Sequence, residues 1–102
     1  MFEEFLNQYV IVRCHDAGVH AGILMKAEGR ACVLKDARRL WYWVPGENGA
    51  FLSGVALYGL NPKSKVGEPV PNIVLTENCE IILCSSAAEK SIRAARVNVN
   101  GK

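Results

Sequence analysis

Residues 9–34, YVIVRCHDAGVHAGILMKAEGRACVL, decide the fold class, because they contain three strand-like runs joined by two short turns. The runs 9–14, 19–26 and 30–34 are rich in β-branched and other apolar residues, which favour strands. The intervening tripeptides, DAG and AEG, each end in glycine, which readily adopts the positive φ that tight turns require. This stretch therefore predicts three antiparallel strands in a meander.

The patterning changes from strand-like to helix-like near the middle of the chain. Residues 38–44, RRLWYWV, have strand propensity, so we expect the third strand to reach them through a bend or bulge at residues 35–37. Residues 45–49, PGENG, then break the strand, and residues 50–60 place apolar side chains close to helical spacing. A short helix is therefore predicted for residues 50–60.

The last part of the chain contains a second pair of strands and a final helix. Residues 61–72 hold three of the four prolines and are expected to form a loop. Residues 73–75 and 80–84 are predicted strands with a tight connection between them. One of the two serines at 85–86 can cap a helix over residues 87–96, and the tail VNVNGK is expected to fray.

The strand order predicts a small barrel. Five short strands, with a meander first and a closing pair last, would otherwise form a sheet with two unpaired edges. The expected fold class is mainly β with short helices (α+β), as one domain over residues 1–102 with a helical insertion at about 45–70 and a C-terminal helix. This layout resembles the Sm-like and SH3-like small barrels, and the Sm-like resemblance implies single-stranded nucleic-acid binding. The insertion departs from the short connection of Sm-like proteins.

A second resemblance covers most of the chain. The strings YVIVR, AGVHAG, ARRLWYW and VPNIVLTENCEII are similar to a family of small uncharacterised proteins found mainly in tailed bacteriophages. The resemblance implies a phage or prophage source and no catalytic activity. Small phage proteins of this kind are often host-directed binders, and some oligomeric β-rich examples resemble sponges that sequester nucleotide immune signals.

Composition indicates a cytoplasmic protein. No apolar run reaches the roughly 18 residues of a membrane-spanning helix, and the N-terminus MFEEFLNQYV lacks the features of a signal peptide, so the mature chain is expected to start at Met1. If the protein is phage-encoded, the compartment is the host cytoplasm. Without an oxidising compartment, free thiols are expected at Cys14, Cys32, Cys79 and Cys84.

The stretch RRLWYW, residues 38–43, is the main candidate for a binding site. Because side chains alternate between the two faces of a strand, its residues divide into two sets. The first set is Arg39, Trp41 and Trp43, and the second is Arg38, Leu40 and Tyr42. Arginine offers a bidentate fork to phosphate, and an indole ring offers a surface on which a base stacks for roughly 1–3 kcal/mol. The candidate ligand contacts are therefore Arg38, Arg39, Trp41 and Trp43, with Arg39, Trp41 and Trp43 preferred.

Two other residues are added to this candidate site. Arg13 ends the first strand and His20 begins the second, so they could be neighbours across the turn and contact a phosphate or ribose. His15 lies at the turn itself, where we expect it to be exposed. Two structural alternatives remain open for the stretch RRLWYW, residues 38–43. Its tryptophans either pack the insertion helix against the barrel or form a subunit interface.

Enzymatic activity is not expected from this sequence. The cysteine and histidine spacings match no metal site, only two histidines could supply a general base, and no phosphate-binding glycine loop is present, so no catalytic residue, metal or cofactor is predicted. The favoured function is noncatalytic sequestration of a small anionic nucleotide-like ligand by a homo-oligomer. The alternatives are an Sm-like single-stranded nucleic-acid binder, which the formal net charge of +2 disfavours, and a structural or host-protein interaction module.

Overall fold

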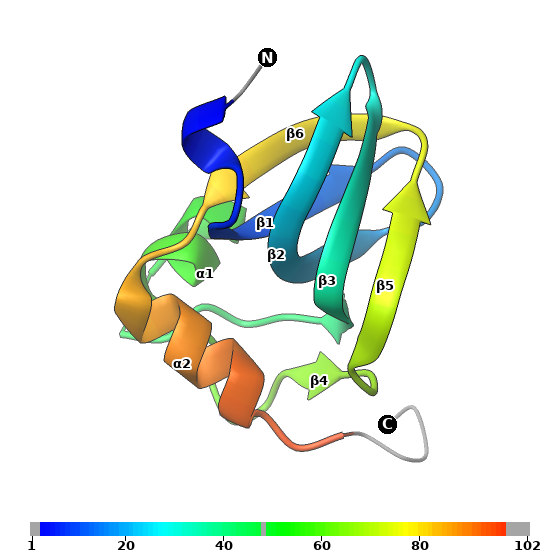
Figure 1. Ribbon diagram of the computed structural model, residues 1–102. Helices are drawn as coiled ribbons and strands as arrows, with labels where there is room; N and C mark the ends of the chain where they lie inside the picture. The colour runs from blue at the N-terminus through cyan, green and yellow to red at the C-terminus, as the bar shows by residue number, and fades with distance from the viewer. Residues whose placement is uncertain (1–2, 48, 98–102) are drawn as a thin grey trace.

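The computed structural model describes residues 3–47 and 49–97 (Figure 1). It confirms the predicted class: the chain is mainly an antiparallel sheet with two short α-helices. The elements are η1 (Glu3–Phe5), β1 (Tyr9–Cys14), β2 (Val19–Glu28), β3 (Ala31–Tyr42), α1 (Phe51–Tyr58), β4 (Lys65–Val66), β5 (Val70–Leu75), β6 (Asn78–Leu83) and α2 (Ser86–Ala94). Neither α-helix in the described ranges has the length and apolar composition that crossing a membrane requires.

The sheet has the strand order of a small, partly open barrel. Strands β6, β1, β2 and β3 pair in that order, and all of the pairs are antiparallel. The remaining edge of β3 is shared, since β5 pairs with its first half and β4 with its second half. The short connection between β5 and β6 brings these two strands toward each other at one end of the sheet (Figure 1). The expectation that the last two strands close the barrel as a pair is wrong: among the described residues β5 and β6 form no ladder with each other, so the barrel is open along that side.

Irregular pairing between β2 and β3 lets the sheet curve. The register shifts between Ala21 and Ile23, opposite residues 36–37 of β3, and again between Leu24 and Lys26. Gly22 lies at the first shift, where a Cβ atom would come within 3.0 Å of the Lys35 carbonyl oxygen. Glycine is therefore needed here so that the two strands can approach closely.

Strand β1 is buried on both faces and divides the core into two clusters. Tyr9 and Ile11 pack beneath the helices, together with Ala21, Leu40, Leu52, Val55, Ala56, Val66 and Ile92. Val10 and Val12 pack inside the barrel, together with Cys14, Leu24, Cys32, Leu34, Ala37 and Leu75. Burial on both sides explains why YVIVRC is almost continuously apolar rather than alternating. Each fully buried aliphatic side chain of this kind contributes about 1.5–3 kcal/mol to folding.

The two helices begin and end close to where the sequence predicts. Helix α1 spans Phe51–Tyr58 within the predicted 50–60 and ends at Gly59, whose φ is 83°. Helix α2 is capped by Ser85, whose Oγ accepts a hydrogen bond of 3.0 Å from the Ala88 amide. The same hydroxyl donates to the carbonyl of Leu57 at 2.7 Å, so one serine caps α2 and ties it to α1.

Several details differ from the sequence-based expectations. The bulge expected at residues 35–37, by contrast, is confirmed: β3 continues to Tyr42, Ala21 and Ile23 pair with Arg38 and Lys35, and Asp36 has φ 53°. Strand β4 lies in the predicted loop, and β5 begins at Val70 rather than 73 because an edge strand tolerates Pro71. Helix η1 was not predicted. Of the tail expected to fray, Val97 forms a bridge to Val66, and the rest lies outside the described residues.

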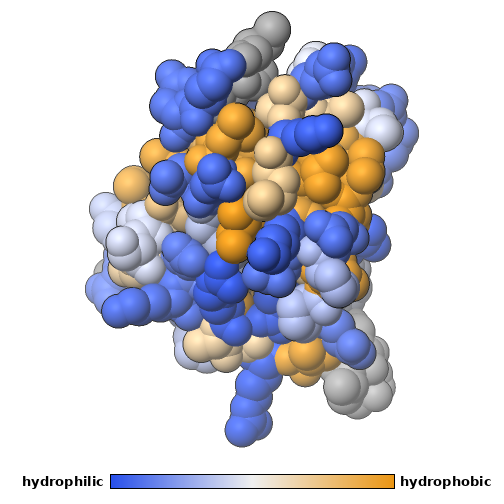
Figure 2. All heavy atoms as spheres, viewed as in Figure 1, coloured by the Kyte–Doolittle hydropathy of each residue, from blue (hydrophilic) through white to orange (hydrophobic). Residues whose placement is uncertain are grey.

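Figure 2 shows how hydropathy is distributed over one face of the molecule. Hydrophobic side chains gather over the region of β2, β3 and β5, and hydrophilic side chains dominate over α2. Met25 and Val74 belong to the exposed large hydrophobic residues of these strands, and Val74 is 62% exposed. Among the described residues, the edge formed by β5 is therefore both unpaired on its outer side and partly apolar.

Candidate ligand-binding site

At the end of β3, the two neighbouring arginines of the stretch 38–43 point in different directions. Arg38 and Leu40 are directed into the protein and are 4% and 2% exposed. Arg39 is exposed, and Trp41 is 59% exposed. The predicted alternation therefore holds up to Trp41. Tyr42 departs from it, because it is exposed at the strand end, where the pairing with β4 shifts register.

Arg39, Trp41 and Trp43 come together at one open hollow of about 220 Å³. The turn between β1 and β2 forms its other wall. The lining residues are Asp16, Ala17, Gly18, Val19, Arg39, Leu40, Trp41 and Trp43. Trp43 is half-buried and also packs against the core beneath the helices. Small-molecule sites usually measure about 300–1,000 Å³, so this hollow has room for part of a nucleotide, with the remainder in solvent.

The guanidinium of Arg39 is available to an anion. Within residues 3–47 and 49–97, no carboxylate or carbonyl accepts a hydrogen bond from it, and its backbone carbonyl accepts one from the Gly67 amide at 2.9 Å. The main chain is thus fixed while the side chain keeps its donors free. A free guanidinium fork can bind two oxygens of a phosphate or carboxylate group at once.

A second cation lies over the exposed rings beside the hollow. The ammonium of Lys65 is 5.1 Å from the centroid of the Trp41 ring and 5.8 Å from that of Tyr42. Strand β4 positions this lysine by pairing with the end of β3. Lys65 was not predicted as a site residue, because its segment was expected to be a loop and a two-residue strand has almost no pattern of its own.

Arg38 has a structural role instead of the predicted ligand contact. Its Nε donates to the Gly67 carbonyl at 3.0 Å, and its Nη1 donates to the carbonyls of Ile92 (2.9 Å), Arg93 (3.4 Å) and Ala95 (2.7 Å). Three of these carbonyls belong to the C-terminal end of α2, the negative end of its dipole, which compensates the buried charge. Burial lowers the pKa of Arg38, although a guanidinium remains protonated at neutral pH.

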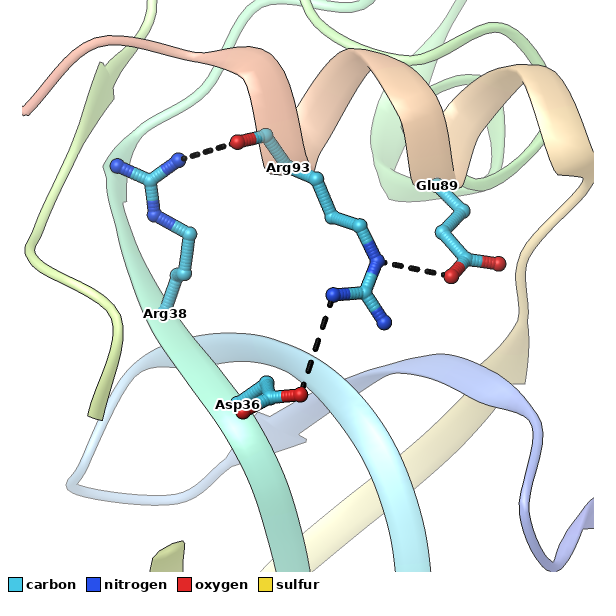
Figure 3. Close-up of polar contacts among 4 residues, drawn as sticks. All are labelled: Asp36, Arg38, Glu89 and Arg93. Atoms are coloured by element: carbon cyan, nitrogen blue, oxygen red, sulfur yellow. Dashed lines mark hydrogen bonds and ion pairs between the residues drawn. The ribbon is translucent and has the colours of Figure 1, made fainter. Parts of the chain in front are cut away.

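Figure 3 shows that Arg38 extends from β3 to the end of α2, whereas the side chain of Arg93 extends from α2 toward Asp36 of β3. Arg93 Nε donates to the Glu89 carboxylate one turn earlier at 2.8 Å, and its Nη1 lies 4.0 Å from the Asp36 carboxylate of β3. Its guanidinium also covers the ring of Tyr9 at 5.0 Å from the centroid. Arg38 and Arg93 therefore both connect α2 to the sheet.

The structure also places Arg13 and His20 outside the hollow. Arg13 is exposed on β1 and forms an ion pair with Glu80 of β6, with 2.8 Å between Nε and Oε1. His20 is 1% exposed, and its Nε2 donates to the Ala17 carbonyl at 2.9 Å. Burial lowers the pKa of His20, with a smaller contribution from Arg39, so the imidazole is neutral. His20 therefore supports the turn that forms one wall of the hollow.

A larger hollow offers fewer free groups that could bind a ligand. The one between α2 and the segment after α1 measures about 520 Å³ and includes Arg96. Its two serine hydroxyls are already bonded to backbone, Ser64 to Val44 and Ser91 to the Leu60 amide. No aromatic ring lines it among the described residues. The smaller hollow is therefore the better candidate, because it combines a free guanidinium with an exposed indole.

Comparison with protein families gives a match over most of the chain. The family described as "Domain of unknown function (DUF6948)" matches residues 7–92. The chain belongs to this family. Comparison with curated proteins and with solved structures gives no match. In this DUF6948 domain the matched region includes all six strands and every residue that lines the candidate hollow.

All four cysteines of the DUF6948 domain are free in the structure. Burial raises the pKa of Cys84 to about 12 and also raises those of Cys14 and Cys32. These three thiols are therefore poor nucleophiles at neutral pH. Cys79 is exposed on β6, away from the hollow that Arg39 and Trp41 line.

Proposed function

We propose that this protein is a noncatalytic binder of a small anionic nucleotide-like ligand. The observation that carries the proposal is the free guanidinium of Arg39 beside the exposed ring of Trp41 at a single hollow. We further propose that the protein is a phage-encoded homo-oligomer and that it sequesters a host nucleotide immune signal in the host cytoplasm. The resemblance to small phage proteins supports this part of the proposal.

The proposed contacts bind two parts of the ligand, the phosphate through charge and the base through stacking. Arg39 binds the phosphate through a charge-assisted contact of about 1.5–3 kcal/mol, and Trp41 stacks on the base for roughly 1–3 kcal/mol. Lys65 lies over the Trp41 ring, so the base uses the opposite face or displaces the ammonium toward the phosphate. Of the described residues that line the hollow, only Asp16 carries a carboxylate, and none is a cysteine, serine or histidine that could act as a nucleophile or base.

The strength of these contacts favours an oligomer. Together they amount to about 2.5–6 kcal/mol, whereas a Kd of 1 mM corresponds to about 4 kcal/mol and a Kd of 1 μM to about 8 kcal/mol. One hollow alone therefore binds too weakly for sequestration. We propose that copies of the chain associate through the free edge of β5, with exposed Val74, or through α1, where Phe51 is 82% exposed. Light scattering at tens of micromolar should give a dimer or larger assembly, and a monomer mass would contradict this part.

The second candidate is single-stranded nucleic-acid binding. Tyr42 and Lys65 continue the aromatic and basic surface beyond the hollow, which is the combination that stacks successive bases and follows a phosphate backbone. Salt dependence separates the two candidates. Affinity for a polyanion falls steeply with salt because each phosphate contact releases counterions, whereas a mononucleotide gives a shallow slope.

The test is calorimetric titration of the full chain with adenosine monophosphate, guanosine monophosphate, a cyclic dinucleotide and oligo-deoxythymidine. We expect saturable binding of at least one nucleotide, and a loss of roughly 10- to 150-fold in affinity for Arg39→Ala. Trp41→Ala should lose a comparable factor. Arg96→Ala is the matched control, because it removes an exposed arginine from the larger hollow beside α2 and should leave the affinity unchanged. Binding that survives Arg39→Ala, or the absence of binding to all four probes, would overturn the proposal.

A further inference from the structure

A cluster of potential metal ligands lies where two connections of the barrel meet. His15 and Asp16 belong to the β1–β2 turn, and Glu77 belongs to the β5–β6 connection. One imidazole nitrogen and two carboxylate oxygens, one from each residue, all lie within 4.8 Å of one another. His15 Nδ1 is 3.0 Å from Asp16 Oδ1, and all three side chains are exposed. The three residues thus present one nitrogen and two oxygen donors to a common point.

Backbone hydrogen bonds hold the two connections in place. The His15 amide donates to the Glu77 carbonyl at 3.0 Å and so joins the turn directly to the connection. On the turn, the Cys14 amide donates to the Gly18 carbonyl at 2.8 Å. On the other side, the Asn78 amide donates to the Arg30 carbonyl at 2.9 Å. The backbone that carries the three donors is therefore ordered, and only side-chain rotation is needed to bring them together.

The charges of the cluster favour a cation. In the described part of the chain, no lysine or arginine forms an ion pair with Asp16 or Glu77. The nearest arginine along the chain, Arg13, is already paired with Glu80. Two carboxylates in so small a space repel each other, and a bound divalent cation removes that repulsion.

Asp16 connects this cluster to the candidate ligand site. It lines the hollow that also contains Arg39 and Trp41. By itself, a carboxylate at that position repels the phosphate of an anionic ligand. A divalent cation held by Asp16 and Glu77 neutralises their two negative charges and so removes this repulsion.

We propose that His15, Asp16 and Glu77 bind a first-row divalent cation of the zinc class next to the Arg39–Trp41 hollow. Imidazole and carboxylate donors suit such ions, with metal–ligand distances of about 2.0–2.2 Å. Tetrahedral donors then lie about 3.4 Å apart. His15 Nδ1 and Asp16 Oδ1, at 3.0 Å, are already this close, and the exposed Glu77 carboxylate, whose donor atom lies within 4.8 Å of the other two, moves in by roughly 1 Å. Three protein ligands leave a position open for water or for a phosphate oxygen. This last step, coordination of the ligand's phosphate, rests on the proposed nucleotide-binding function, whereas metal binding itself does not.

The first experiment measures the metal alone. The full chain, without a histidine tag, is titrated calorimetrically with Zn²⁺, and Co²⁺ is used as a spectroscopic probe. We expect one ion per chain, with cobalt bands of nitrogen and oxygen ligation and no thiolate charge-transfer band. Asp16→Asn, Glu77→Gln and His15→Ala should each weaken Zn²⁺ binding by roughly 10-fold or more, since even residues that only support a ligand contribute 10- to 100-fold.

Two controls separate this site from other donors. Glu28→Gln removes an exposed carboxylate at the other end of β2, and Cys79→Ser removes the exposed thiol. Both should bind Zn²⁺ within 2-fold of the natural chain. Circular dichroism should show that the three ligand variants remain folded, because their side chains are exposed. Equal Zn²⁺ affinity in the natural chain and in Glu77→Gln, or loss of binding in Cys79→Ser, would overturn the metal site.

The second experiment tests the coupling to the hollow. Adenosine monophosphate binding is compared with and without Zn²⁺ in the natural chain and in Glu77→Gln. Zn²⁺ should strengthen binding at least 10-fold in the natural chain and have no effect in the variant, whose metal-free affinity should be unchanged. Zn²⁺ binding without this enhancement would overturn the coupling and leave the metal site standing. Loss of metal-free nucleotide binding would instead contradict the proposed function.

Discussion

Replacing Arg38 by alanine should destabilise the protein by about 3–4 kcal/mol. The side chain is buried and donates at 2.7–3.0 Å to the carbonyls of Gly67, Ile92 and Ala95. Net contributions of about 1 kcal/mol for each of three bonds, with some cost for carbonyls left without a donor, lead to this figure. At urea slopes of about 1–3 kcal/mol/M, the unfolding midpoint should fall by roughly 1–4 M.

The neighbouring arginine is the matched control for this measurement. Arg39→Ala removes the same charge from an exposed position and should change the free energy of unfolding by no more than about 0.5 kcal/mol. Urea unfolding followed by tryptophan fluorescence measures both variants, and hydrogen exchange at the end of α2 should quicken in Arg38→Ala alone. Equal stability of the two variants would refute the conclusion that Arg38 joins the helix to the sheet.

Three further predictions follow from individual residues. Gly59→Ala should lower the melting temperature, with a loss of about 1–3 kcal/mol, because φ is 83° and a Cβ would lie 2.5 Å from that of Ser91; an unchanged melting temperature would contradict this. Tyr9→Phe should leave stability to urea unchanged or raise it by up to about 1 kcal/mol, because the buried hydroxyl has no hydrogen-bond partner among the described residues; a clear loss would show a missed partner. Burial lowers the pKa of His20 from 6.5, so the unfolded chain binds the proton more tightly. The stability that neutral His20 contributes is therefore fully present above pH 6.5 and is lost as the pH falls through the folded-state pKa. The variant His20→Gln should lack this part of the pH dependence. Identical profiles of unfolding free energy against pH in the two proteins would refute this prediction.

Much of the fold was predictable because its signals are local. The meander depends on two glycine-containing turns, and helix α2 on a serine cap, all of which lie within short stretches of sequence. Strand β4 was not predictable, because two residues carry no periodicity and their pairing depends on where β3 ends. The start of β5 was missed because Pro71 indicates a loop unless the position is known to be on a sheet edge.

The candidate site was predictable only in part. Strand alternation correctly separated Arg39 and Trp41 from Arg38 and Leu40, but it does not tell which side faces solvent. That choice depends on α2, whose C-terminal carbonyls accept hydrogen bonds from Arg38. The meeting of His15 and Asp16 with Glu77 depends on the pairing of β1 with β6, which no local pattern specifies.

The most direct test of the binding site is a nitrogen-15 NMR titration of the full chain with the nucleotide of highest affinity. The chain has two tryptophans, so the indole N–H signals of Trp41 and Trp43 can be assigned by two single substitutions. Saturable shifts should appear at Trp41, at the Arg39 side chain and at the backbone of the β1–β2 turn, residues 16–19. Shifts confined to residues around the hollow beside α2, such as Ser91, or no shifts at saturating nucleotide, would contradict the assignment of the binding site to the Arg39–Trp41 hollow.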